Sequence, residues 1–79
     1  MVTSREWRTY GDGSTTYYFD TSNGKIVGQA HSISHTKIWV AKIIHNYNEE
    51  QYLGQYISEH FAKAAIEQHW SISDRTLLE

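Results

Sequence analysis

The residues best equipped for chemistry in this chain of 79 residues are five histidines, because the sequence contains no cysteine. His31 and His35 flank the end of a predicted strand, so they do not share a helical face. His60 and His69 stand nine positions apart in a predicted helix, which places them on opposite faces at about 100° per residue. Neither pair has the spacing of a known zinc motif. We therefore expect no metal site and no cofactor.

The acidic residues offer no better basis for catalysis. Glu49 and Glu50 are adjacent in the chain and cannot oppose each other as an acid and a base. Asp12 and Asp20 lie in predicted turns, where aspartate is common because it accepts backbone hydrogen bonds. The pair of glycines in 11–13 is too short for a phosphate-binding loop. We predict no catalytic residues and no enzyme activity.

Turn signals divide the first part of the chain into short strands. Gly11–Ser14 and the Asn23–Gly24 pair are typical turn sequences. The segments between them are rich in β-branched and aromatic residues. Strands are predicted at residues 5–10, 15–20, 25–32, 37–45 and 51–57. Gly28 and Ala30 share one face of the third strand and leave room there for a close neighbour.

A helix is predicted to follow the last strand. Ser58 occupies an N-cap position and Glu59 the first turn. Apolar residues then recur at helical spacing, and we expect their face to dock on the sheet through Phe61, Ile66 and Trp70. The periodicity ends at Trp70. The sequence therefore predicts one domain over residues 1–70 and a flexible C-terminal tail over residues 71–79.

These elements predict an α+β fold, in which four or five antiparallel strands form a meander and one C-terminal α-helix packs on one face. A single helix leaves the other face of the sheet uncovered. The residues expected there are candidates for partner binding: Tyr18, Ile38, Val40, Ile44 and Tyr56. Either a homodimer, formed sheet to sheet or through an edge strand, covers this face, or the N-terminal hairpin folds over it.

Composition favours a protein partner over a nucleic acid. Aromatic residues make up 14% of the chain, which suits a protein-binding surface. Seven basic and nine acidic residues give a net charge of −2, without the basic patch of a typical nucleic-acid binder. An RNA- or DNA-binding module that stacks bases on the sheet aromatics, or uses the helix, is the alternative. No stretch is apolar enough for a membrane helix and no signal peptide is evident, so we expect a cytoplasmic protein.

Two resemblances bear on these expectations. Residues 35–70, with their strands and a helix containing Ala62–Ala65, resemble the C-terminal half of a double-stranded RNA-binding domain; this implies the fold more than RNA binding, because Ser58 and Glu59 stand where that family has lysines. The patterns at 39–43, 53–56 and 62–67 are similar to small uncharacterised phage and bacterial proteins. That likeness implies a virus-encoded accessory factor, an inhibitor of a host protein in the host cytoplasm, without an active site.

Overall fold

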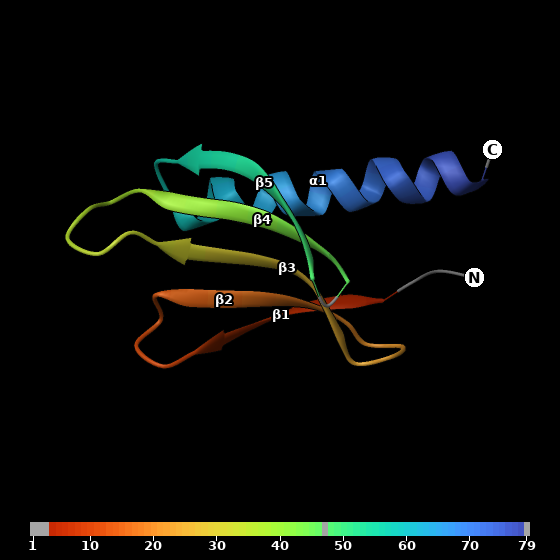
Figure 1. Ribbon diagram of the computed structural model, residues 1–79, viewed down its shortest axis with the longest axis horizontal. Coiled ribbons are helices and arrows are strands. Elements are labelled where there is room, and N and C mark those ends of the chain that lie inside the picture. The colour runs from red at the N-terminus through yellow and green to blue at the C-terminus, as the bar shows by residue number, and fades with distance from the viewer. Residues whose placement is uncertain (1–3, 47, 79) are drawn as a thin grey trace.

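The computed structural model describes residues 4–46 and 48–78 and has five strands followed by one helix. The elements are β1 (Arg5–Tyr10), β2 (Thr15–Asp20), β3 (Lys25–Ser32), β4 (Trp39–Asn46), β5 (Glu49–Tyr56) and α1 (Glu59–Leu78). All neighbouring strands are antiparallel, in the order β1-β2-β3-β4-β5. The predicted α+β meander with one C-terminal helix is confirmed. Figure 1 shows the twisted sheet with α1 along one side.

The tight turns form where the sequence predicts them. Gly24 has a φ of 72°, a left-handed conformation that glycine adopts without steric cost. Beside it, the carboxylate of Asp20 accepts a hydrogen bond from the backbone N–H of Ser22 at 2.9 Å. The carboxylate of Asp12 accepts one in the same way from Ser14, at 3.0 Å. Hydrogen bonds from Ser14 lower the pKa of Asp12, because they stabilise the ionised carboxylate. This carboxylate therefore has a structural role in the turn.

The helix begins as predicted and ends later than predicted. The hydroxyl of Ser58 accepts a hydrogen bond from the backbone N–H of Phe61 at 3.2 Å, which is the expected N-cap. Lys63 pairs with Glu59 at 2.7 Å, one turn away. The helix continues through Leu78, so the boundary at Trp70 is wrong; residues 71–78 contain no glycine or proline that would stop it. The last residue of the predicted tail, residue 79, lies outside the described residues.

The core lies between α1 and one face of the sheet. Its buried residues are small or branched: Ala30, Ala41, Ile43, Ala62 and Ile66. Larger side chains surround this cluster and are partly buried: Trp7, Tyr18, Trp39, Leu53, Tyr56 and Trp70. Because alanines face each other at the centre, the helix backbone can approach the sheet closely, and the aromatic rings close the margins.

One residue predicted to dock the helix does not. Ile66 is fully buried and Trp70 packs against the core cluster, but Phe61 is 51% exposed. Phe61 precedes Ala62 by one position, which turns its side chain about 100° away from the buried stripe. The prediction that Phe61 packs on the sheet is therefore wrong.

Gly28 marks the closest approach of helix and sheet. A Cβ atom built on Gly28 would lie 2.6 Å from the Cγ2 atom of Ile66. The room predicted beside Gly28 is therefore occupied by Ile66.

We expect Gly28→Ala to lower the free energy of unfolding by about 1–3 kcal/mol, because the added methyl group overpacks the core. Chemical denaturation measures the loss. Gln29→Ala, at the next position on the other face of β3, is the control and should change stability by less than about 1 kcal/mol. An unchanged stability in Gly28→Ala would mean that α1 sits farther from β3 than described.

Candidate interaction surface

The acidic and histidine residues do not gather into a metal-binding group in the part of the chain that the structure describes. No group of three or more histidine, cysteine, aspartate or glutamate residues is close enough there to hold a metal ion. The closest histidines are His45 and His69, with ring centroids 6.0 Å apart beside Trp70. The Nε2 atom of His45 is 2.8 Å from the side-chain oxygen of Gln51, so its ring is held by a neighbour on β5.

Two faces of the sheet can be told apart from the strand register. Trp7 pairs with Tyr18, Tyr18 with Gly28, and Gly28 with Ile43, and this row faces α1. Side chains alternate along a strand, so the residues between them point away from the helix. We call the side away from α1 the open face.

Aromatic rings line the open face over β1 and β2. The rings of Tyr10 and Tyr17 lie 5.6 Å apart, edge to face, and those of Tyr17 and Phe19 lie 6.4 Å apart. These geometries are the favourable ones for neighbouring aromatic side chains. Tyr10 is about half exposed at the outer end of the row. The three residues, Tyr10, Tyr17 and Phe19, are called the aromatic row below.

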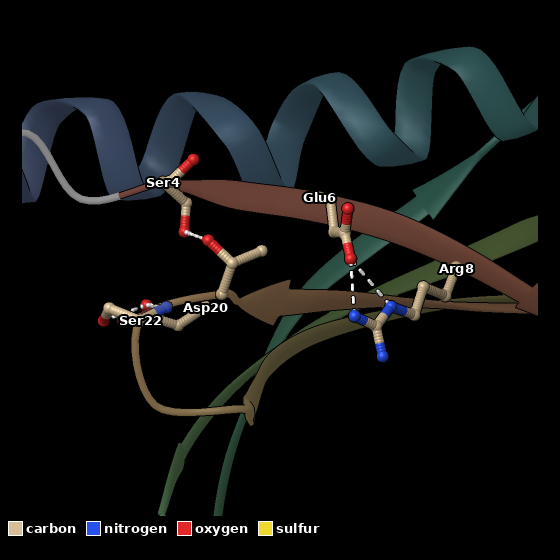
Figure 2. Close-up of polar contacts among 6 residues, drawn as sticks. Ser4, Glu6, Arg8, Asp20 and Ser22 are labelled. Carbon is tan, nitrogen blue, oxygen red and sulfur yellow. Dashed lines mark hydrogen bonds and ion pairs between the residues drawn. The ribbon is translucent and has the colours of Figure 1, made fainter.

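The cations beside the aromatic row already have carboxylate partners. Arg8 donates two hydrogen bonds, from Nε at 2.8 Å and from Nη2 at 2.5 Å, to one oxygen of Glu6. Figure 2 shows both side chains extending from β1 on the side away from α1. The hydrogen bonds to Glu6 raise the pKa of Arg8, and its guanidinium lies 4.6 Å from the centre of the Phe19 ring. On β4, Lys42 pairs with Glu50 at 3.6 Å.

Val40 and His31 lie side by side on the open face, between the ion pairs at its margins. Val40, on β4, is buried, and His31 pairs with it across the ladder. Burial lowers the pKa of His31, and the positive charge of Lys42 lowers it further. Both effects favour the uncharged form of His31, which contributes a flat ring to this surface.

Apolar residues also line a hollow at one end of the open face, between the turn joining β2 to β3 and the end of β4. Its volume is about 780 Å³. Ile26, Val27 and Ile44 form part of its wall, with Lys25 and Glu50 at its polar margin. The hollow extends the apolar surface beyond the aromatic row.

The five residues predicted to bind a partner do not share one face. Val40 and Ile44 belong to the open face, and Ile38 is exposed in the loop before β4. Tyr18 and Tyr56 pack against the core cluster, and the ring of Tyr18 stacks on Trp7 at 4.5 Å. The predicted outward position of these two tyrosines is wrong, because Trp7 and Trp39, their ladder partners, face α1.

The predicted set of partner-binding residues therefore omits the aromatic row, although Tyr17 and Phe19 are among the sheet aromatics considered for base stacking. A signal for it exists in the first hairpin. A four-residue turn at 11–14 pairs Tyr10 with Thr15 and so Trp7 with Tyr18. If Trp7 faces the core, Tyr18 must face it too, and Tyr17 and Phe19 must face away.

Comparisons with known proteins leave the surface without an assigned role. No protein-family model, no curated protein and no solved structure matches the chain. Within residues 4–46 and 48–78, the single helix is not apolar enough over a sufficient length to cross a membrane.

Proposed function

We propose that this protein is a small, non-enzymatic binding module that holds a partner protein on the open face of its sheet. The observation that carries the proposal is the aromatic row, Tyr10–Tyr17–Phe19, on the face that α1 does not cover. Tyrosine and arginine are enriched among the residues that dominate binding energy at protein interfaces. Here Arg8 lies over Phe19, whose ring contacts Tyr17, so the arginine and the tyrosines belong to one surface.

The chemistry of the surface favours a partner with an apolar patch and a polar rim. The rings and Ile44 supply contact area, while the ion pairs Arg8–Glu6 and Lys42–Glu50 can exchange hydrogen bonds with polar groups around it. The rings are already ordered by contact with each other, which reduces the entropy lost when a partner binds.

The same ion pairs weigh against the alternative, an RNA- or DNA-binding module. Aromatic rings on a sheet can stack bases, but affinity for nucleic acid depends mainly on cations that neutralise phosphates. On the strands of the open face, Arg8 and Lys42 each lie beside a carboxylate that a phosphate would have to displace. Nucleic acid is therefore the second candidate.

The proposal extends to the origin and target of the protein. The likeness of the short patterns at 39–43, 53–56 and 62–67 to small phage proteins, which no curated match accompanies, favours a virus-encoded factor that inhibits a host protein in the host cytoplasm. A small scaffold that presents one binding face needs no active site for this role, because occupying the surface of a target is sufficient to block it.

Affinity capture with matched variants tests the proposed function. The wild-type protein is used to capture a partner from a lysate of its source, and the partner's affinity is then measured with purified components. We expect Tyr10→Ala and Tyr17→Ala each to weaken binding at least tenfold, equivalent to about 1.4 kcal/mol. Lys37→Ala, at an exposed position in the loop before β4, is the control and should bind like wild type.

Two results would contradict the proposal. Equal binding by the wild type and both tyrosine variants would place the contact elsewhere. Capture that disappears after nuclease treatment, with an affinity that falls steeply as salt increases, would assign the surface to nucleic acid instead.

A further inference from the structure

The hollow at one end of the open face forms where β3 and β4 separate. The ladder between these strands ends at the pair Gly28–Ile43, although β3 begins at Lys25 and β4 continues to Asn46. Residues 25–27 and 44–46 extend beyond this last pair, and all of them line the hollow. Its volume of about 780 Å³ lies within the range of about 300–1,000 Å³ that is typical of small-molecule sites.

An irregularity in each strand accounts for the separation. The register between β2 and β3 shifts just before Phe19, which leaves Val27 as an extra residue in β3. The register between β4 and β5 shifts between Ile44 and Asn46, which leaves His45 as an extra residue in β4. An extra residue of this kind bends its strand and increases the local twist. The hollow is therefore produced by the path of the backbone, and not only by side chains on a flat sheet.

The helix closes the gap between the two strands from one side. The indole of Trp70 donates a hydrogen bond to the carbonyl of Val27, in β3, at 3.1 Å. The same ring lies 6.1 Å from the ring of His45, in β4. Because Trp70 contacts both separating strands from the side of α1, the open face is the side from which a ligand can enter.

The hollow combines apolar walls with one positive charge that has no counterion. Ile26, Val27 and Ile44 supply the apolar surface. Glu50, at the margin, pairs with Lys42 at 3.6 Å. Lys25, also at the margin, takes part in none of the ion pairs among the described side chains. Of the lysine and the glutamate that line the hollow, the glutamate therefore has a partner and the lysine has none.

We propose that this hollow binds a small amphipathic anion, which is an apolar body that carries one acidic group. The apolar body packs against the three branched side chains of the wall, and the acidic group pairs with the ammonium of Lys25. Charge complementarity argues for an anion, because a cationic ligand would have to displace Lys42 from Glu50 and a neutral ligand would leave Lys25 without a counterion. Apolar walls with a few polar groups that fix orientation are the usual design of small-molecule sites.

The ligand site is distinct from the aromatic row. Ile26 pairs with Phe19, so the hollow begins where the row ends, and Tyr10 lies at the other end of the row. Binding of a small anion therefore adds to the proposed function and does not depend on it.

Fluorescence titration with two matched probes tests the site. Anilinonaphthalene sulfonate has an apolar aromatic body and one acidic group, and phenylnaphthylamine has the same body without the charge. We expect Lys25→Gln to weaken binding of the sulfonate about fivefold, the upper range for one ion pair that is open to solvent, and to leave binding of the neutral amine unchanged. Lys37→Gln, at an exposed position in the loop before β4, is the control and should bind both probes like wild type.

Truncation of the wall tests the apolar part of the site. Ile26→Ala should weaken binding of both probes, because both use the same apolar wall. Ile57→Ala, which truncates an isoleucine that is 79% exposed in the link to α1, should weaken neither. Each variant must unfold at the same denaturant concentration as wild type, since the sulfonate also binds partly unfolded proteins. Absence of saturable sulfonate binding, or an equal loss in Lys25→Gln and Lys37→Gln, would overturn the proposal.

Amide chemical shifts locate the probe without a substitution. On addition of the sulfonate to wild-type protein, we expect the largest shifts at residues 25–27 and 44–46. Largest shifts at Tyr10 and Tyr17 would place the probe on the aromatic row and contradict the proposed site. Neither experiment involves the partner protein, so failure here leaves the partner-binding result unchanged.

Discussion

Trp70→Ala is expected to lower the free energy of unfolding by about 3 kcal/mol, the lower end of the range for a large aromatic residue cut back to alanine. The lower end applies because Trp70 is only partly buried at the margin of the core. The substitution removes the packing of the Trp70 ring against the core cluster and the hydrogen bond from its indole to the carbonyl of Val27. It also removes the contact of the same ring with the Arg5 guanidinium, which lies 5.1 Å from the ring centre. A loss of this size approaches the total stability of a small domain.

Chemical denaturation of Trp70→Ala, with two comparison variants, tests this account of the helix. Trp70→Phe keeps a ring but removes the indole N–H, and should cost about 1 kcal/mol from the lost hydrogen bond. Phe61→Ala truncates the other aromatic residue of α1 at an exposed position, and should cost less than about 1 kcal/mol. If Phe61→Ala were the more destabilising of the two alanine variants, the orientation of α1 described here would be wrong.

Ile66→Ala is expected to lower the free energy of unfolding by about 2–5 kcal/mol, the range for isoleucine cut back to alanine in a packed core. Ile66 is fully buried in the core cluster with Ala30, Ala41 and Ala62, small residues that cannot shift to fill the space that it leaves. The cavity therefore persists and adds to the loss of buried apolar area. Denaturant titration, with Ile72→Ala at an exposed position of the same helix as the control, measures the effect.

The contact between Ile66 and Gly28 makes a sharper prediction for the pair. Gly28→Ala alone crowds the Cγ2 atom of Ile66, and Ile66→Ala alone leaves a cavity. In the double variant the new methyl group occupies part of that cavity. We expect the double variant to be less destabilised than the sum of the single changes, by about 0.5–3 kcal/mol, as is usual for residues in contact. Simple additivity would show that the two residues do not touch.

The strands and their order could be predicted from the sequence because local signals determine them. The Asn23–Gly24 pair and the Gly11–Ser14 turn fix two hairpins, and antiparallel neighbours follow from short connections. The helix start was equally local, since Ser58 caps it through a single side chain. These features depend on residues close together in the chain.

The assignment of residues to faces was less predictable, because it depends on register between strands. Tyr18, in a run of three aromatics, has no local signal that separates it from Tyr17 and Phe19. Only its pairing with Trp7 decides which ring enters the core. Phe61 was misplaced for a similar reason: the helical stripe is centred on Ala62 and Ile66, and alanine is a weak marker of burial.

The division of the molecule into a covered face and an open face is the basis of the proposed function. α1 covers the row of small residues on β3 and β4, where Gly28 and Ala30 allow it to approach. The rings that this arrangement excludes from the core gather on the other side of β1 and β2. The same packing that stabilises the fold therefore exposes a surface suited to binding.

Site-specific photo-crosslinking in the source cell tests this central claim most directly. A photoreactive phenylalanine analogue is placed at Tyr10, at the exposed end of the aromatic row, and separately at Lys37, an exposed loop position. The account predicts a covalent adduct with one discrete protein from position 10 and none from position 37. An adduct from position 37 alone, or an adduct from position 10 that contains only nucleic acid, would contradict it.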